Sequence, residues 1–397
     1  MNDFKEEISK YSFLSYLKPL SFLIGIFFMN FLGRIVLSPL MPALEKDLRL
    51  GHDEAGSLFF LISFGYCAGL FFSGFISSWL HHRKTIILSS LAIGGALLMV
   101  GFSPHLWGIR VGLLFMGVAA GFYLPSGIAT LTAMVNPRHW GKAIAIHELA
   151  PNLGFIIAPL IAEVLLGWFS WRGVLVILGV ASLAMGFIFT LRGKGGNFPG
   201  EAPRWRTLQI VSKEPSFWLM ILFFSFGIGS SFGVYSMVPL YLVSGKGMDR
   251  TWANTVLALS RVLTVGTSIL SGWITDHLGA KKTLKAAFLT TGTVTALIGV
   301  VSGDWIILAI FIQPILATAF FPAGFAALAR IGSDKIKNVA VSLTVPFGFL
   351  IGGGAIPAGI GLLGEWGAFD LGFILLGGLV LTGVFLVRYL RFFNEPT

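Results

Sequence analysis

Long apolar runs, separated by short polar connections, fill almost the whole chain. A helix needs about 20 mainly apolar residues to cross the ~30 Å hydrocarbon layer of a bilayer. Twelve segments meet this requirement, near residues 21–42, 55–80, 84–103, 107–134, 142–166, 172–191, 216–243, 251–274, 283–301, 305–328, 338–363 and 368–390. The pattern predicts an all-α membrane protein with twelve transmembrane helices.

Composition strengthens this prediction. Of the 397 residues, 55% are hydrophobic and 12% are charged, whereas soluble domains contain ~25% charged residues. The net charge of +10 would suit a nucleic-acid binder only if it were gathered on a water-facing surface, and the mean hydropathy of +0.84 argues against such a surface. The expected surroundings are a lipid bilayer, and no nucleic-acid partner is expected.

The basic residues indicate the orientation in the membrane. Twenty of the 28 Lys and Arg residues, including Lys5, Lys10, Arg204 and Arg206, fall in connections on one side. Five fall on the other side, and three lie inside spans. Because cytoplasmic connections retain Lys and Arg, both termini should lie in the cytoplasm, and the protein should be a multi-pass protein of the cytoplasmic membrane. No cleaved signal peptide is expected, because the first twenty residues lack an Ala-x-Ala-like cleavage site and lead into a full-length span.

A polar connection rich in Gly and Pro divides the predicted spans into two groups of six. It covers residues 192–215, and its composition indicates a flexible cytoplasmic linker. The predicted domains are therefore an N-terminal six-helix bundle, residues 1–191, and a C-terminal six-helix bundle, residues 216–397.

The two groups of spans resemble each other in sequence. Three pairs of landmarks share an offset of 198 residues: Gly74 and Gly272, Trp107 and Trp305, Pro159 and Pro357. Repeats of this size suggest duplicated, pseudo-symmetric halves, from which secondary transporters build a central site.

The loop after the eighth span carries a recognisable motif. Gly272, Asp276, Gly279, Lys281 and Lys282 fit the pattern G-x-x-x-D-x-x-G-x-K/R-K/R at every fixed position. This loop resembles the signature of the major facilitator superfamily. The resemblance implies two six-helix bundles with alternating access, and a cytoplasmic gate in which Asp276 caps a neighbouring helix and pairs with the basic residues.

The loop after the second span is a degenerate copy of this motif. Gly74, Arg83 and Lys84 keep their places, but Ser78 replaces the aspartate and His81 replaces the second glycine. The resemblance assigns these three residues to the gate as well, although the charge lock of this copy is incomplete.

Two arginines inside predicted spans are candidates for substrate binding, because ionisable residues at membrane depth are costly and usually functional. Arg261 lies midway along span 251–274 on a small and polar helix face. Arg34 shares a face with Asn30 and Ser38. The hypothesis is that Arg34 and Arg261, one from each half, clamp one anionic substrate, helped by Asn30. The alternatives are an Arg34 that reaches to the headgroups and an Arg261 in a permanent salt bridge.

Glu148 is the one acidic residue well inside a span, and His147 precedes it. A desolvated carboxylate can load and release protons near neutrality, so Glu148 and His147 are candidates for proton coupling. Asn152 lies one helical turn further and is a candidate substrate contact. The alternatives are a Glu148 paired with an arginine and a His147 that only packs.

Tyr123 and Tyr235 could offer hydroxyl groups to a substrate, although buried tyrosines often only pack. No nucleotide-binding loop, zinc-protease motif or serine-hydrolase motif occurs in the sequence. The single cysteine, Cys67, excludes a disulfide within one chain. No enzyme activity, cofactor or metal is therefore expected.

The sequence thus predicts a secondary transporter of a small organic anion, with a carboxylate as the favoured substrate, coupled to protons and working as a monomer. The first alternative is a proton-driven exporter of amphipathic or lipid-like compounds, suggested by 37 phenylalanines and by the Gly154-x-x-x-Ala158-Pro159 element. The second is a transport-inactive receptor or assembly protein with the same fold.

Overall fold

The computed structural model describes residues 13–202, 209–331 and 334–392, with side chains omitted for 334–339. Lys5, Lys10, Arg204 and Arg206, which contributed to the predicted orientation, lie outside the described residues, as does part of the predicted linker. Every regular element in the described ranges is a helix.

The described residues of the first half form nine helical elements. They are α2 (Leu14–Ile35), α3 (Leu37–Leu48), α4 (His52–Phe102), α5 (Leu106–Gly121), α6 (Tyr123–Met134), η1 (Pro137–His139), α7 (Trp140–His147), α8 (Leu149–Leu166) and α9 (Trp171–Arg192).

The second half includes three π-helical segments, η2, η3 and η4. Its described elements are α11 (Pro215–Ile228), η2 (Gly229–Gly233), α12 (Val234–Leu240), η3 (Tyr241–Gly245), α13 (Arg250–Ser260), α14 (Thr264–Leu278), α15 (Ala280–Ile298), α16 (Asp304–Thr318), α17 (Phe320–Leu328), α18 (Asp334–Gly348), η4 (Phe349–Ala355), α19 (Ile356–Glu365), α20 (Phe369–Leu386) and η5 (Val387–Tyr389).

Proline explains most places where a predicted span is divided into two helices. A proline ring clashes with the carbonyl four residues earlier and lacks the N–H that would bind it. Helices α2, α5, α7 and α16 each end four residues before a proline, at Ile35, Gly121, His147 and Thr318. The prolines concerned are Pro39, Pro125, Pro151 and Pro322.

Within the described ranges, ten segments are long and apolar enough to cross a membrane. One of them, α4, has 51 residues and contains a non-helical residue, His81, at φ 66° and ψ 158°. A straight helix of this length would extend about 75 Å, so the break at His81 separates two arms that were predicted as spans 55–80 and 84–103. Helix α15 has 19 residues and corresponds to predicted span 283–301.

Exposed tryptophans mark both ends of the helical bundle. Five lie near one end, namely Trp107, Trp168, Trp252, Trp305 and Trp366, and four near the other, namely Trp79, Trp140, Trp218 and Trp273. Two such belts are typical of a membrane protein, since the amphipathic indole prefers the headgroup region. The predicted membrane environment is supported.

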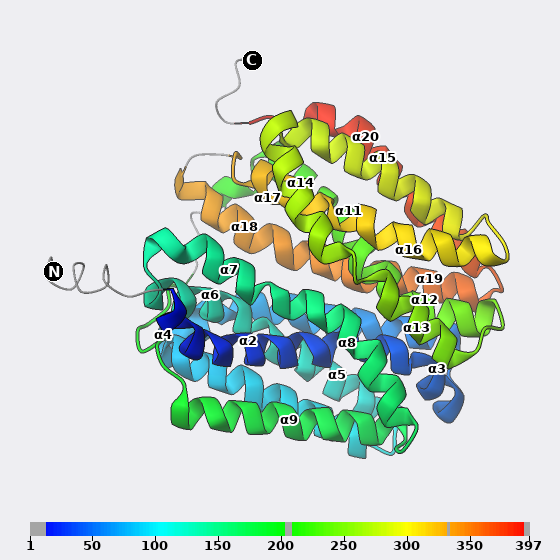
Figure 1. Cartoon of the computed structure of the whole chain (residues 1–397), viewed down its shortest axis with the longest axis horizontal. Helices are drawn as coiled ribbons and strands as arrows, with labels where there is room; N and C mark the ends of the chain where they lie inside the picture. Colours follow the sequence, from blue (N-terminus) through cyan, green and yellow to red (C-terminus); the bar gives the residue numbers. More distant parts are fainter. Residues whose placement is uncertain (1–12, 203–208, 332–333, 393–397) are drawn as a thin grey trace, which may run out of the picture.

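The helices of the two chain halves lie in separate groups, with the first half below and the second half above in Figure 1. The groups meet where α4 packs on α19, α8 on α13, and α3 on α12. We call the end with the turns at residues 49–51, 167–170 and 246–249 the Glu163 end. The opposite end, with the break at His81 and residues 193–202, is the linker end.

Backbones approach closely between the halves near the Glu163 end. A Cβ on Gly56 of α4 would lie 2.9 Å from the Pro357 carbonyl oxygen, and one on Gly361 of α19 would lie 2.4 Å from the His52 carbonyl oxygen. Because only glycine allows this approach, α4 and α19 are in direct contact and this part of the Glu163 end is closed.

Candidate functional site

The three charged residues singled out inside spans all lie at helix breaks. Arg34 is in the last turn of α2, Glu148 separates α7 from α8, and Arg261 follows the last residue of α13. Breaks release backbone groups from helical hydrogen bonding. The charges are therefore located where polar backbone is available inside the bundle.

Arg34 is 3% exposed and is surrounded by aromatic rings. Its guanidinium carbon lies 4.0 Å from the centre of the Tyr66 ring, 5.1 Å from Phe31 and 5.6 Å from Phe349. Its Nε atom has no hydrogen-bond partner among the described residues. The predicted alternative of an arginine reaching to the headgroups does not fit this burial.

Arg261 is also 3% exposed. It donates to the backbone carbonyl of Ser231 over 2.7 Å and to the Ser231 hydroxyl over 3.3 Å. The rings of Phe155 and Tyr235 lie 4.5 and 5.0 Å from its guanidinium carbon. Its Nε atom likewise lacks a partner among the described residues.

Neither arginine takes part in any of the six ion pairs formed by the described residues. The predicted alternative of a permanent salt bridge for Arg261 therefore has no partner in this part of the chain. Aromatic faces stabilise a cation by about 0.5–2 kcal/mol, which is less than the cost of burying a charge without a counter-ion. Both guanidinium groups are therefore buried without a carboxylate counter-ion among the described residues.

One aromatic cluster connects the two arginines. Phe31 contacts Phe155 edge-on, with ring centres 4.9 Å apart. With the distances of 5.1 Å from Arg34 to Phe31 and 4.5 Å from Arg261 to Phe155, this contact limits the separation of the two guanidinium carbons to at most about 14.5 Å. Residues from both chain halves form the cluster, namely Phe31, Tyr66, Phe155, Phe232, Tyr235 and Phe349.

The π-helical segment η2 positions the side chains around Arg261. The carbonyl of Ser230 accepts from the Gln313 amide over 2.7 Å, and the next carbonyl, of Ser231, accepts from Arg261. A π segment changes the hydrogen-bonding register of a helix and frequently occurs at functional sites. A narrow cavity beside this segment is lined by Tyr235, Ser260, Arg261 and Gln313 together with apolar residues.

Sequence reasoning did not assign Ser231 to the site. The only available signal was the Gly-Ser-Ser-Phe-Gly composition of residues 229–233, which does not by itself predict a π segment.

Glu148 and His147 are adjacent to each other and differ in exposure. The Glu148 side chain is 46% exposed, whereas His147 is fully buried, and His147 Nδ1 lies 3.3 Å from Glu148 Oε1. The imidazole stacks on Phe27 at 4.4 Å between ring centres. Asn152 donates to the backbone carbonyl of Glu148 over 2.9 Å.

Three other predicted substrate contacts already bind the protein itself. The Asn30 amide donates to the Ala120 carbonyl over 3.0 Å. The Tyr235 hydroxyl donates to the Phe155 carbonyl over 3.2 Å. The Tyr123 hydroxyl lies 2.7 Å from the Leu23 carbonyl oxygen and 3.0 Å from His147 Nε2.

The two predicted gate loops lie at the linker end. Arg83 donates to the carbonyls of Phe189, Thr190 and Gly193 and so caps the end of α9. Gly74 is half-buried on α4, and Lys84 is exposed.

In the second loop, Gly279 adopts φ 82° between α14 and α15, and Gly272 precedes it on α14. Asp276 and Lys282 are exposed, and Lys281 contacts the Phe392 ring at 4.8 Å. Within the described ranges the Asp276 carboxylate takes part in no ion pair.

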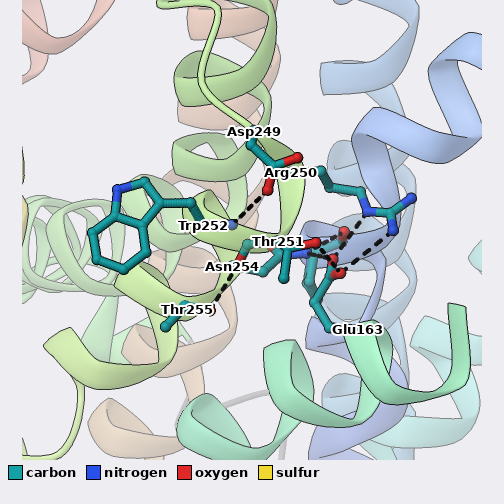
Figure 2. Close-up of polar contacts among 8 residues, drawn as sticks. Glu163, Asp249, Arg250, Thr251, Trp252, Asn254 and Thr255 are labelled. Carbon is teal, nitrogen blue, oxygen red and sulfur yellow. Dashed lines mark hydrogen bonds and ion pairs between the residues drawn. The ribbon is translucent and has the colours of Figure 1, made fainter. Parts of the chain in front are cut away.

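A carboxylate that sequence reasoning did not select holds the Glu163 end. Figure 2 shows Glu163 of α8 facing Arg250, Thr251 and Asn254 of α13. Its oxygens accept from Asn254 Nδ2 at 2.6 Å, Arg250 Nε at 3.0 Å and Thr251 Oγ1 at 3.1 Å. The Asn254 amide also donates to the Pro39 carbonyl over 3.1 Å. Glu163 was missed because it lies near the end of its predicted span, where an acidic residue is unremarkable.

Comparison with known proteins identifies the family. Residues 23–304 match the sequence profile described as Major Facilitator Superfamily. The chain belongs to this superfamily. The resemblance found in the loop motif is therefore confirmed, and the chain is a multi-pass transporter of the cytoplasmic membrane and not an enzyme.

Individual members of the superfamily show the range of functions among its relatives. The chain is 22% identical over 386 residues to a probable sulfoacetate transporter, SauU, of Cupriavidus necator, covering 90% of each chain. It is 22% identical to multidrug resistance protein 2 of Bacillus subtilis, covering 87% of this chain and 94% of that protein. The fold is similar to the inward-facing, occupied crystal structure of a bacterial homologue of the human lysosomal transporter Spinster, with a TM-score of 0.77, 15% identity and coverage of 96% and 98%.

Proposed function

We propose that this member of the superfamily carries a small organic anion between two six-helix bundles, residues 1–191 and 216–397, joined by the linker at 192–215. The observation that carries the proposal is the pair of buried guanidinium groups, Arg34 and Arg261, that lack a carboxylate partner among the described residues. The two arms of α4 and helix α15 complete twelve transmembrane helices, with both termini in the cytoplasm.

The charge of the site defines the class of substrate. Arginine keeps its charge at physiological pH and presents a planar set of donors that fits carboxylate, sulfonate or phosphate oxygens. Two such groups favour an anion with more than one oxyanion oxygen. The similarity to a probable sulfoacetate transporter makes sulfoacetate the first substrate to test.

Proton coupling is proposed for Glu148 and His147. Glu148 is half-exposed and can exchange protons with water, whereas His147 connects it to the buried interior. Asn30, Asn152, Tyr123 and Tyr235 are proposed to line the substrate path after rearrangement, because their polar groups already bind the protein in this conformation.

The linker end is proposed to open to the cytoplasm in this conformation. Asp276 is exposed here and takes part in none of the ion pairs of the described residues, as expected if it pairs with Lys281 and Lys282 only when this end closes. We propose that the protein works as a monomer, because both arginines and the aromatic cluster come from one chain.

The test is uptake of labelled sulfoacetate into proteoliposomes, with and without an imposed pH gradient. We expect Arg34→Gln and Arg261→Gln each to lower uptake about 30-fold or more, because loss of one partner from a buried charge pair costs about 2–5 kcal/mol. Glu148→Gln should bind sulfoacetate but no longer accumulate it when a pH gradient is applied. Arg172→Gln, which removes an exposed ion pair with Asp47, is the matched control.

The outcome that rejects the anion site is full uptake by both Arg34→Gln and Arg261→Gln proteins. A panel of other carboxylates and phosphate esters distinguishes a wrong first substrate from a wrong substrate class.

A second candidate function is export of amphipathic compounds. The similarity to multidrug resistance protein 2 and the aromatic cluster favour it. Proton-driven efflux of a lipophilic cation that is insensitive to Arg34→Gln and Arg261→Gln would establish this function in place of anion transport.

A further inference from the structure

Four polar groups form a continuous chain inside the first half of the protein. The Tyr123 hydroxyl lies between the Leu23 carbonyl oxygen, at 2.7 Å, and His147 Nε2, at 3.0 Å. On the other side of the ring, His147 Nδ1 lies 3.3 Å from Glu148 Oε1. Tyr123 and His147 are both fully buried, so water does not supply alternative partners.

The number of protons available to these four groups determines the tautomer of the histidine. A carbonyl oxygen only accepts, so the 2.7 Å contact between the Leu23 and Tyr123 oxygens requires the one hydroxyl proton of Tyr123. The tyrosine oxygen is then an acceptor towards His147, and His147 Nε2 must carry a hydrogen. Tyr123 thus selects the Nε2–H form of the imidazole.

With its hydrogen on Nε2, a neutral His147 has no proton for the contact between Nδ1 and the Glu148 carboxylate. In a neutral imidazole with hydrogen on Nε2, the Nδ1 atom is an acceptor, and it faces an ionised carboxylate oxygen that is also an acceptor. Two acceptors repel at 3.3 Å, whereas one proton between them makes a charge-assisted or neutral hydrogen bond. We infer that His147 and Glu148 together hold one exchangeable proton, and that Tyr123 is the positioning residue that creates this proton site.

The surroundings of the pair contain few competing charges. Helix α6 contributes Tyr123, and helix α2 contributes the Phe27 ring and the Leu23 carbonyl. Asn152 of α8 binds the backbone carbonyl of Glu148 and not its carboxylate. The Glu148 charge also acts on Tyr66 of α4, which lies against Arg34, so Arg34 is the cation of this region that can compete with the proton for the carboxylate.

The use of this proton in transport rests on the proton coupling proposed above, but its presence in the resting protein does not. An anion bound at Arg34 would weaken the attraction between that arginine and Glu148, which favours keeping the proton on the pair. Substrate and proton would then be carried in the same direction.

The experiment measures the histidine directly, without any substrate. The full-length protein is labelled with ¹⁵N-histidine in nanodiscs, and the signal of His147 among the seven histidines is identified by its loss in His147→Gln. Titration between about pH 5 and pH 9, which brackets the ordinary histidine range, reports hydrogen on Nδ1 and Nε2. The ¹³C carboxyl signal of Glu148 reports its protonation in the same samples.

We expect the wild type to keep hydrogen on Nε2 throughout, and to lose one proton from the pair in a single titration step. Tyr123→Phe removes the acceptor at Nε2, so His147 should change to the neutral Nδ1–H form, which donates to Glu148 without an extra proton. Glu148→Gln supplies an amide donor to Nδ1, so His147 should stay in the neutral Nε2–H form and the step should disappear.

A neutral Nδ1–H imidazole beside an ionised Glu148 in the wild type would overturn the inference. Tyr241→Phe is the matched control, because Tyr241 also contacts a backbone carbonyl, that of Ile298, and a carboxylate, that of Asp370, but lies at the Glu163 end. This control should leave the His147 signal unchanged. Because this experiment uses no transported compound, its result does not depend on whether sulfoacetate is taken up. The proton site and the substrate are therefore tested independently.

Discussion

At the scale of single residues, His81 and Gly279 are equivalent positions in the sequence repeat with nearly the same backbone conformation. They are 198 residues apart, and their ψ angles are 158° and 154° at φ 66° and 82°. This region of conformational space is open mainly to glycine, and other residues occupy it at a cost of about 1–3 kcal/mol. The two loops thus share one backbone geometry, although histidine occupies the position in the first half and glycine in the second.

His81→Gly should therefore stabilise the protein. The relieved strain exceeds the entropy cost of a glycine, which is about 0.5–1 kcal/mol, so we expect a gain of about 1 kcal/mol. The exposed His81 ring contributes little that would be lost. Thermal unfolding in detergent should show a rise of about 2 °C in the apparent midpoint.

The reciprocal change Gly279→Ala serves as the comparison. A Cβ at this position meets no atom within 4 Å, so any loss of stability arises from the backbone alone. A fall in the midpoint for His81→Gly, or no change for Gly279→Ala, would show that the positive φ angles carry no strain.

Individual residues differ in how well the sequence predicts their roles. Arg34, Arg261 and Glu148 were identified because a charge inside an apolar run is conspicuous, and the structure shows the two arginines buried without carboxylate partners among the described residues. Glu163 was not identified, because its importance depends on a partner that is 91 residues away in the sequence. No local pattern predicts such pairings.

At the scale of helices, the hydrophobic pattern predicted the apolar segments but not the breaks within them. The pattern located the apolar segments, but treated 107–134 and 305–328 as single helices, whereas both are interrupted four residues before a proline. The π segments were not foreseen. Two of them, η2 and η4, pack closely on each other, and a Cβ on Gly233 would lie 2.6 Å from the Gly352 carbonyl oxygen; the sequence does not predict this contact.

The end of α9 depends on an arginine from a different helix. Removing the donors in Arg83→Gln leaves carbonyls of Phe189, Thr190 and Gly193 without these hydrogen bonds, and we expect a loss of about 1–2 kcal/mol. Limited trypsin digestion at Lys194, which is exposed beyond α9, should become several-fold faster. Lys84→Gln changes an exposed neighbour and should leave the digestion rate unaltered; equal rates in the two variants would rule out capping by Arg83.

At the scale of the whole molecule, the Glu163 end is rich in ion pairs, but most of them lie within one half of the chain. Arg110 with Glu54, Arg172 with Asp47, and Lys246 with Asp370 each connect helices of the same half. Among the described ion pairs, Arg250 with Glu163 is the one that joins the two halves. Any motion that opens this end must break it.

We therefore expect Glu163→Gln to favour opening of the Glu163 end. Loss of charge-assisted hydrogen bonds of about 1.5–3 kcal/mol should raise the open population about 10-fold or more. A cysteine in place of Ser38, which is fully buried at this end and donates to the Tyr235 carbonyl of the other half, reports opening by its rate of reaction with a water-soluble thiol reagent. The measurement uses a Cys67→Ser background, since Cys67 is the only native cysteine.

Arg172→Gln is the control, because it removes an ion pair of the same kind within one half of the chain. If Arg172→Gln increases the reaction rate as much as Glu163→Gln does, the effect of Glu163→Gln comes from a general loosening of the Glu163 end and not from separation of the two halves.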